Sequence, residues 1–544
     1  MPEILLIQPP IQDFYLTRKR TMPYGLACLA GSLEKAGFAV TIFDALATQK
    51  SKPLPLPDQM SYLAPFYGQP DVSPFALFHQ YRHFGYSYQH IERIIRESGA
   101  YLVGISSLFT PYSAAAEKVA AIVKTVDPAI IVVMGGHHPT ALPEAAMQCP
   151  SVDYVLRGEA EETLPVLAAA VKSGRSPAGI PGLVRRLPDG RLQAGKPAWL
   201  QNLDAVAPPA MHLVKHRYYQ RGSRGAAVVV ASRGCPLQCS YCAFGADSGC
   251  SYRKRSVGSI MQEIDGQVRT HDIGFIDFED ENLSMDRDWF MTLMAAIEGC
   301  CAERNIELRA MNGLYPPALD EAMVRAMRAA GFKTLNLALG ATAADQLKRF
   351  KRKDVRRTFE AALQAAERYD MTAVGYIIIG APDQSAEDSL SDLLYLAGQR
   401  VLAGVSVFYP APGSRDYQHC QQRGFLPERY DLMRATALPL DQRTSRLECV
   451  TLLRLGRILN FMKALQDQGV PVSIRHMRTP GDLPDTADRT AVGSWLLQDF
   501  FRSGIIRGLS PEGRLYEHKT APSLVRMFID GIRNMDVQGV SSSG

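Results

Sequence analysis

The sequence contains few cysteines and no long apolar run. Only 10 of its 544 residues are cysteine, and only three of them stand close together. This scarcity argues against a disulfide framework and favours a reducing compartment with a metal or cofactor site. No apolar stretch reaches the roughly 18 residues of a membrane-spanning helix, and the first residues, MPEILLIQPP, lack the basic start of a signal peptide. We therefore expect a cytoplasmic protein without a transmembrane segment.

The sequence also has little excess charge of either sign. Lys and Arg number 60, Asp and Glu 55, and the formal net charge is +5, which for this length does not predict a nucleic-acid partner. The basic run KRFKRKDVRR (348–357) is typical of a solvated helix start. A hydrophobic content of 46% and a charged content of 21% are those of a globular protein. The length suffices for about three domains.

Short apolar runs alternate with helical patterns in residues 1–170. Such runs predict the strands of a parallel sheet covered on both faces, a doubly wound α/β domain. The expected strands are 4–7, 39–43, 101–105, 130–134 and 153–156. Ligands of these sheets bind outside the carboxyl ends of the strands, where SSLFT (106–110), GGHHPT (135–140) and RGEAEET (157–163) stand. Tight turns of an ordinary domain are the alternative interpretation, and loop histidines are more often hydrogen-bonding groups than metal ligands.

A second α/β region follows a connector at residues 171–225. Six further apolar runs separated by helical patterns predict a partial (β/α)6 barrel over 226–415, with its chemistry at the carboxyl ends of the strands. The runs are 226–231, 273–279, 306–311, 332–339, 374–379 and 403–408. Residues 416–544 carry amphipathic patterns and predict a helical C-terminal domain. The Pro- and aromatic-rich stretch 48–75 predicts an ordered insertion, for which surface packing is favoured over a substrate lid.

The three clustered cysteines directly follow the first barrel strand. Cys235, Cys239 and Cys242 stand in RGCPLQCSYCAFG (233–245) at x3 and x2 spacings. Three thiolates can hold a 4Fe–4S cluster by three irons and leave the fourth iron open to a chelating ligand. The alternatives are a three-cysteine zinc site or unrelated loop cysteines.

This motif, with Tyr241 before its third cysteine, resembles the cluster loop of radical S-adenosylmethionine enzymes. Residues 4–168, with MPYGLACLAGSLEKAGFAVTIFDA, GGHHPT and DYVLRGEAEETL, are similar to the cobalamin-binding domain at the front of the class B methyltransferase-like members of that family. The resemblance implies three cofactors: a 4Fe–4S cluster on the catalytic cysteines, S-adenosylmethionine and cobalamin. It also implies an external low-potential electron donor of flavodoxin or ferredoxin type.

The resemblance also implies two sets of cofactor contacts. Those to S-adenosylmethionine come from Tyr241, Phe244, Arg255, Glu279, Asp280, Glu281, Asn312, Asn336, Gly380 and Gln384. Those to cobalamin come from Tyr24, Gly25, Ser106, Ser107, Leu108, Thr110, Gly135, Gly136, His137, His138, Gly158 and Glu159. A solvated acidic loop at 279–281 and helix capping by the two asparagines are the alternatives.

Two departures from the family pattern qualify these contacts. The segment after the first strand, QPPIQDFYLTRKR, has no histidine, so we expect no histidine on cobalt and place the loop around Leu108 near the lower face of cobalamin. After the fourth barrel strand, LALGAT has Gly340 where the family carries glutamate, which removes one expected contact to S-adenosylmethionine.

The reaction implied by the resemblance is methyl transfer to an unactivated carbon or phosphorus of a small-molecule or natural-product substrate. One S-adenosylmethionine supplies the methyl group by way of cobalamin, and a second supplies the radical. The first alternative is a non-methylating cyclase or ring-rearranging enzyme. The second is a catalytically silent cobalamin and iron–sulfur sensor.

Overall fold

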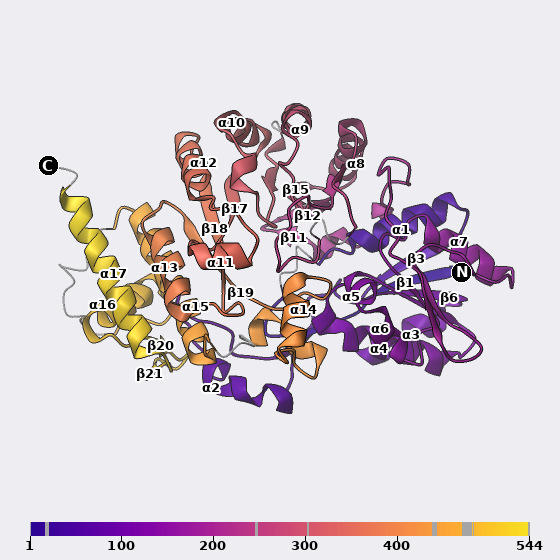
Figure 1. Cartoon of the computed structure of the whole chain (residues 1–544), viewed down its shortest axis with the longest axis horizontal. Coiled ribbons are helices and arrows are strands. Elements are labelled where there is room, and N and C mark those ends of the chain that lie inside the picture. Colours follow the sequence, from indigo (N-terminus) through magenta and orange to yellow (C-terminus); the bar gives the residue numbers. More distant parts are fainter. Residues whose placement is uncertain are drawn as a thin grey trace.

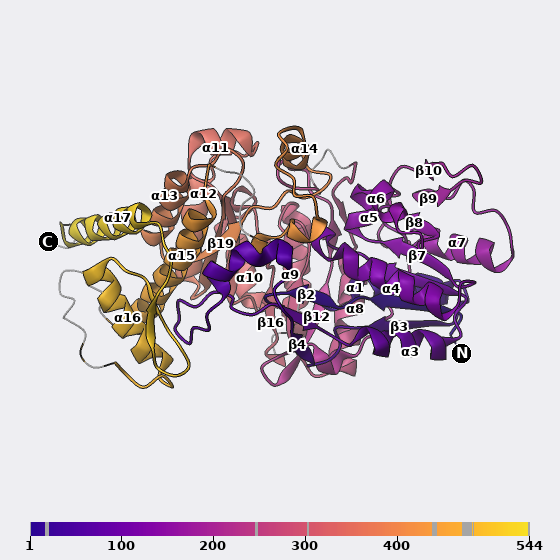
Figure 2. The ribbon, with the colours of Figure 1, turned by 90° about the horizontal axis from the view of Figure 1, so that it is seen from below.

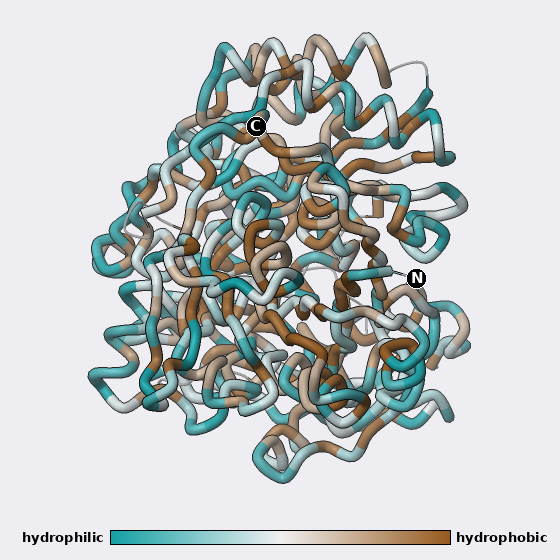
Figure 3. Tube along the Cα trace, turned by 90° about the vertical axis from the view of Figure 1, so that its right-hand side faces the viewer, coloured by the Kyte–Doolittle hydropathy of each residue, from teal (hydrophilic) through white to brown (hydrophobic). Residues whose placement is uncertain are grey.

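The chain folds into three regions that follow one another across the molecule (Figure 1). This computed structural model describes residues 2–16, 21–244, 249–301, 304–437, 443–470, 481 and 483–541, with side chains up to Met535. Gly245, the last residue of the cysteine motif, and residues 17–20 of the segment after the first strand lie outside the described residues. Figure 3 shows hydrophobic residues gathered in the interior and hydrophilic residues around the rim.

The first region is a seven-stranded sheet with order β10-β9-β8-β7-β6-β1-β3. Its five predicted strands are present and parallel: β1 (Ile4–Gln8), β3 (Val40–Asp44), β6 (Leu102–Ser106), β7 (Ile131–Gly135) and β8 (Tyr154–Leu156). Helices α1 (Tyr24–Lys35) and α7 (Thr163–Lys172) cover one face, and α3 (Tyr88–Ser98) and α4 (Ser113–Val126) cover the other. Two antiparallel strands, β9 (Leu183–Arg186) and β10 (Leu192–Ala194), extend the sheet from within the predicted connector.

The second region contains six parallel strands in an open arc. They are β12 (Arg224–Val229), β15 (Ile273–Phe278), β16 (Glu307–Arg309), β17 (Thr334–Gly340), β18 (Thr372–Ile379) and β19 (Leu402–Val407). A bridge between Leu308 and Phe332 joins the two halves of the arc. Helices line its outer side (Figure 1): α8 (Val257–Thr270), α9 (Arg287–Cys301), α10 (Glu321–Ala330), α12 (Arg356–Arg368) and α13 (Ala386–Ala397). The predicted α/β fold class, with a partial six-stranded barrel, is confirmed.

The C-terminal region is mainly helical, as predicted. It comprises α15 (Arg446–Asp467), α16 (Arg489–Ser503), α17 (Pro522–Ser541) and a hairpin of β20 (Arg507–Leu509) and β21 (Leu515–Glu517). A capping box between Ser445 and Glu448 starts α15, and the buried face of this helix joins the core of the barrel. None of the helices in the described ranges is both long and apolar enough to cross a bilayer.

The insertion at 48–75 packs against the barrel and the C-terminal helices. It contains β4 (Ser51–Pro53), the 3-10 helix η2 (Asp58–Leu63) and α2 (Ala64–Tyr67), and β4 pairs with β5 (Arg82–Phe84), which also pairs with β2 (Ile11–Asp13). Met60, Leu63, Tyr67 and Phe75 are buried in the core that the barrel and the C-terminal helices share. Figure 2 shows this segment running beneath the barrel toward α16. The arrangement supports packing over a lid.

Candidate cluster and cobalamin site

The cysteine loop begins at the carboxyl end of β12 and is closed at its base by a two-stranded ribbon. Strand β13 (Ser232–Arg233) pairs antiparallel with β14 (Arg253–Lys254). Gly234 follows with φ +82°, and a Cβ there would lie 2.4 Å from the carbonyl oxygen of Ser251. Only glycine fits this turn without strain, so the residue before Cys235 fixes the direction in which the loop leaves the ribbon.

Two carboxylates after β15 hold the start of the loop. Asp280 is buried and accepts hydrogen bonds from Ser232 Oγ at 2.6 Å and Ala231 N at 3.2 Å. Glu281 Oε2 accepts from Gly234 N at 3.0 Å. Burial raises the pKa of Asp280 to about 7 and also raises the pKa of Glu281. These predicted cofactor contacts therefore position the cluster loop, and half-buried Glu279 lies beside them.

The three thiols lie within electrostatic reach of one another. Burial raises the pKa of Cys242 to about 11 and that of Cys235 as well, and ionised Cys239 adds to both shifts. Among the described residues, no three potential ligands surround a single point where one metal ion would sit. Each cysteine of a 4Fe–4S cluster binds a different iron, so three neighbouring thiols that do not converge on one point fit that group.

Side chains between the cysteines are bonded to other parts of the chain. Ser240 Oγ donates to Asp416 at 3.0 Å, at the start of α14 (Arg415–Gln422). The Tyr241 ring meets Phe350 edge-on at 4.9 Å, and its hydroxyl accepts a hydrogen bond from Arg352 at 2.8 Å. The loop is thereby fixed to elements from the second half of the barrel.

The remaining residues predicted to contact S-adenosylmethionine differ in whether they have a polar atom free to bind it. Asn312 donates to the carbonyl oxygen of Asp280 at 3.2 Å, and Asn336 donates to Tyr376 OH at 2.7 Å. The buried Oδ1 of Asn336 has no hydrogen-bond partner in the part of the chain that the structure describes, which fits an acceptor for a cofactor hydroxyl. Gln384 is fully buried and bridges Ala381 N and Ile378 O, so it braces the turn after β18 that contains Gly380. These bonds give Gln384 a structural role.

Arg255 and Tyr24 meet at the contact between the first and second regions. Arg255 is half-buried and pairs with Glu263 at 2.5 Å, and Tyr24 donates to the same carboxylate at 3.2 Å. Burial raises the pKa of Tyr24, and the charge on Glu263 raises it further. The two residues were predicted to contact different cofactors, but their polar atoms are committed to this contact. Gly25 is exposed on the neighbouring turn of α1.

The cobalamin sheet presents two adjoining loops at its carboxyl edge. Ser106 and Gly135 are paired at the ends of β6 and β7, and Ser107 N donates to Gly135 O at 2.8 Å. Gly136 has φ +117°, and a Cβ there would lie 2.5 Å from Ser107 O. These small residues bring the two loops into contact. The loop tip after Ser107 is apolar and open, with Leu108 45% and Phe109 48% exposed.

Polar atoms without partners lie beneath this apolar tip. His138 is buried, and its Nδ1 lies 3.4 Å from Thr110 Oγ1. The backbone N–H of His138 donates to the carbonyl oxygen of Ser107. Ser107 Oγ and His138 Nε2 are buried with no partner among the described residues. An apolar surface above unpaired hydrogen-bonding atoms fits cobalamin, whose flat ring carries polar side groups.

His137 lies between this edge and the cysteine loop. Its ring is exposed. The ring meets Phe244 edge-on at 4.4 Å, and Phe109 lies 6.5 Å away. The loop at the edge of the first sheet and the cysteine loop are therefore in direct contact at these rings.

Gly158 and Glu159 are covered by the connector instead. A Cβ at Gly158 would lie 2.1 Å from Ala198 O. Glu159 pairs with Arg253 at 2.7 Å and with Arg233 at 3.4 Å. The Glu159 carboxylate therefore joins the sheet to the base of the cluster loop, and the prediction that these two residues contact cobalamin has no geometric support here.

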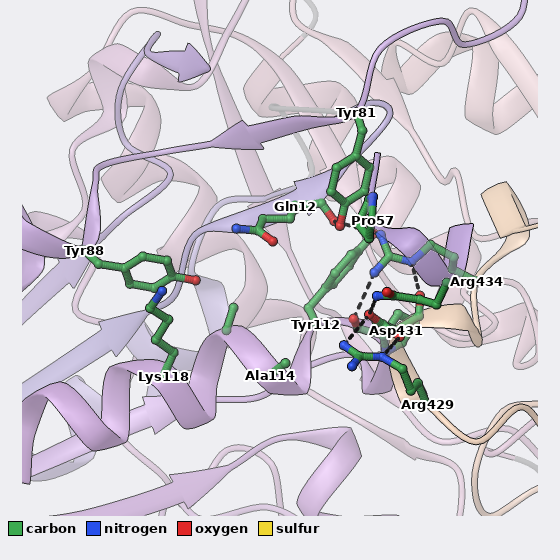
Figure 4. Close-up of a pocket in the computed structure, with 13 residues that line it drawn as sticks. Gln12, Pro57, Tyr81, Tyr88, Tyr112, Ala114, Lys118, Arg429, Asp431 and Arg434 are labelled. Carbon is green, nitrogen blue, oxygen red and sulfur yellow. Dashed lines mark hydrogen bonds and ion pairs between the residues drawn. The ribbon is translucent and has the colours of Figure 1, made fainter. Parts of the chain in front are cut away.

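The segment after β1 contains an ion pair where related cobalamin proteins carry histidine. Buried Asp13 faces Arg434 at 3.3 Å and accepts from Tyr112 OH at 2.7 Å. Arg434 also lines a pocket of about 220 Å³ between α4 and the 3-10 helix η9 (Tyr430–Leu432), together with Tyr81 and Asp431 (Figure 4). This pairing agrees with the expectation that the segment supplies no cobalt ligand.

Sequence reasoning missed Arg352, Asp416 and Tyr409. Arg352 stands in the basic run that was interpreted as a solvated helix start, although it is half-buried beside Tyr241. Tyr409 is 40% exposed, but the pKa of its hydroxyl is raised by burial and by Cys242, which places it near the thiols. Its position directly after the last barrel strand was the available signal.

A doubly wound sheet is thus followed by a six-stranded partial barrel whose first strand leads into the cysteine loop. Comparison with known families identifies both parts: the B12 binding domain model matches residues 77–168, and the Radical SAM superfamily model matches residues 229–394. The chain therefore contains the two domains that together define the cobalamin-binding radical S-adenosylmethionine enzymes. The predicted cofactors, a 4Fe–4S cluster, S-adenosylmethionine and cobalamin, are confirmed as those of this family.

Similar proteins include both methyltransferases and a cyclase. The chain is 25% identical to cytidylyl-2-hydroxyethylphosphonate methyltransferase of Streptomyces wedmorensis over 80% of this chain and 84% of that protein. It is 31% identical to anaerobic magnesium-protoporphyrin IX monomethyl ester cyclase of Rubrivivax gelatinosus, over 45% of this chain and 44% of the cyclase. The radical S-adenosylmethionine methyltransferase TsrM of Kitasatospora setae has a similar fold, with TM-score 0.60 and 15% identity over 99% of both chains.

Proposed function

We propose that the chain is a cobalamin-dependent radical S-adenosylmethionine methyltransferase that acts on an unactivated carbon or phosphorus of a small molecule. One observation carries this proposal: the cysteine loop meets the carboxyl edge of the first sheet, where the rings of Phe244 and His137 lie 4.4 Å apart. A substrate bound beside this contact would be reached from both sides. The broad match to a phosphonate methyltransferase supports the same reaction.

The residues of the cysteine loop, of the barrel and of the loop after β6 have distinct roles in this proposal. When bound, S-adenosylmethionine supplies the radical and cobalamin carries the methyl group. Cys235, Cys239 and Cys242 hold the cluster, and Asn336 Oδ1 accepts a hydroxyl of S-adenosylmethionine. Leu108 and Phe109 form an apolar surface for the corrin ring and exclude water from it.

The proposed division of the chain follows from these roles. Residues 1–170 bind cobalamin, 171–225 connect, 226–415 form the radical domain and 416–544 close the barrel. Strands β9 and β10 nevertheless join the cobalamin sheet from within the connector. We place the enzyme in the cytoplasm, with a flavodoxin- or ferredoxin-type protein as electron donor.

Product analysis tests the proposal. Methyl transfer by this route consumes two molecules of S-adenosylmethionine, so a true substrate should give S-adenosylhomocysteine and 5′-deoxyadenosine in equal amounts. Mass spectrometry of the anaerobic reaction measures both. Even without substrate, the reduced enzyme should release 5′-deoxyadenosine slowly, because the open iron still binds the cofactor. A fully clustered, reduced protein that releases none would exclude every radical mechanism for this chain.

The cyclase is the second candidate, because the segment shared with it has the higher identity of 31%. A cyclase or ring-rearranging enzyme needs only the radical, so 5′-deoxyadenosine should dominate over S-adenosylhomocysteine. A silent sensor should produce neither compound, although it would bind both cofactors. The ratio of the two products thus separates the three functions.

A further inference from the structure

Arg352 places a positive charge directly against the cysteine loop. Its Nη1 lies 2.8 Å from Tyr241 OH and 4.0 Å from the sulfur of Cys239, and its Nη2 donates to Ala338 O at 2.7 Å. The guanidinium also lies over the ring of Tyr315, 5.7 Å from its centroid. These four contacts fix the orientation of the side chain, which is half-buried.

No carboxylate in the described part of the chain forms an ion pair with this guanidinium. Its Nε is buried and has no hydrogen-bond partner there. The Nε points at Gly340: a Cβ at position 340 would lie 3.4 Å from Nε and 3.7 Å from the guanidinium carbon. An acidic side chain at 340 would therefore reach Arg352. With glycine there, the charge of Arg352 is left uncompensated on that side.

Arg352 carries a fixed positive charge, because a guanidinium stays protonated in proteins. A fixed cation near a thiolate ligand favours the more negative state of an iron–sulfur cluster, because local charge and hydrogen bonds to sulfur set the reduction potential. The effect is strong where solvent is excluded.

We propose that Arg352 is a positioning residue that raises the reduction potential of the cluster on Cys239, and that Gly340 is required to leave its charge unpaired. This inference rests on the proposed cluster and goes beyond the reaction assigned to it. Arg352 acts through Cys239 and Tyr241 and touches no reacting atom, so its effect is on electron acceptance by the cluster.

Redox titration of the clustered protein without S-adenosylmethionine or cobalamin, followed by electron paramagnetic resonance, tests the inference. Arg352→Gln should lower the equilibrium constant for one-electron reduction about tenfold, which corresponds to about 59 mV. Arg352→Lys keeps the charge and should stay near the wild-type potential. Arg349→Gln removes an exposed arginine of the same basic run and should change nothing. Equal potentials for Arg352→Gln and Arg349→Gln, or for the Gln and Lys variants at 352, would overturn the inference.

A second pair of variants leaves Arg352 in place. Gly340 has φ +87°, so Gly340→Ala and Gly340→Glu carry the same backbone strain and differ by the carboxylate. Gly340→Glu should lower the potential relative to Gly340→Ala by about the same tenfold factor, because it neutralises Arg352. No difference between the two would contradict the role of Gly340. A wild-type protein that assembles no 4Fe–4S cluster would instead overturn the proposed function.

Discussion

At the scale of single residues, the candidate site depends on side chains that hold the cysteines as much as on the cysteines. Asp280 and Glu281 tie down the start of the loop, and Ser240 and Tyr241 are bonded to Asp416 and Arg352. The three thiols could be predicted from their spacing, because the motif is local. Their partners come from distant parts of the chain, and no local pattern marks them.

Loss of the three cysteines should abolish the cluster. After anaerobic reconstitution, the wild type should carry about four irons per chain with thiolate-to-iron absorption. The triple variant Cys235→Ala/Cys239→Ala/Cys242→Ala should carry none, by iron assay and absorption spectroscopy. The control is Cys149→Ala/Cys300→Ala, which removes two half-buried cysteines outside the loop. Iron retained by the triple variant would refute the cluster assignment.

His138 should make the apoprotein sensitive to mild acid. Burial lowers the pKa of His138 to about 4 from its ordinary value of 6.5, so the folded state binds fewer protons than the unfolded state between these values. Stability is therefore fully present above pH 6.5 and falls as the pH drops toward 4. At 1.36 kcal/mol per pKa unit, the loss reaches about 3 kcal/mol.

The matching variant is His138→Gln, which cannot acquire this charge. Urea unfolding of the apoprotein from pH 7 to pH 4 should show a smaller loss of free energy of unfolding for His138→Gln than for the wild type. His79→Gln, at an exposed position, should follow the wild type. Identical pH dependence for His138→Gln and the wild type would show that His138 is not a buried neutral group.

At the scale of helices and strands, the sequence was most informative where parallel strands are buried on both faces. All eleven predicted strands are present, and most begin and end within one or two residues of the predicted limits. They could be predicted because such strands consist of continuous apolar runs. The exception is β16, which is reduced to Glu307–Arg309. Strands β9, with sequence LVRR, and β10, with sequence LQA, were missed because they are short and partly polar. The division into four segments remains a prediction.

The exposed tip of the loop after β6 should contact cobalamin through the apolar side chains of Leu108 and Phe109. Leu108→Glu places a charge on that surface and should weaken cobalamin binding at least tenfold, which corresponds to about 1.4 kcal/mol; Leu108→Met should bind as the wild type does. Equilibrium dialysis measures the affinities.

The cobalt(II) form of the wild type should show no nitrogen splitting in its electron paramagnetic resonance spectrum. A nitrogen triplet would mean that a histidine binds cobalt after all.

At the scale of the whole molecule, a charged network joins the cobalamin domain to the barrel. Glu159 belongs to the first region and Arg253 to the base of the cluster loop, and their side chains are 11% and 8% exposed. Arg233 also pairs with buried Glu161 at 2.7 Å. We therefore expect this network to hold the two domains in contact.

Arg253→Met should destabilise the protein strongly. It leaves Glu159 with a single, longer pair, and breaking a buried ion pair typically costs about 3–5 kcal/mol. Denaturant unfolding measures the loss, and Lys172→Met, which removes an exposed pair with Glu3, should have a much smaller effect. Cobalamin and iron binding should weaken together in Arg253→Met. A variant as stable as Lys172→Met would show that the network does not join the domains.

The anchoring of the cysteine loop also bears on the order of events during synthesis. The loop bonds to Arg352 and Asp416, which follow Tyr241 by 111 residues and Ser240 by 176 residues. While the ribosome is still translating these segments, the cysteines are already outside without the partners that orient them. We therefore expect the growing chain to hold iron poorly. Delivery of iron and sulfide would then act on a nearly finished polypeptide, and a ribosome that stalls before residue 416 would release a chain that cannot keep its cluster.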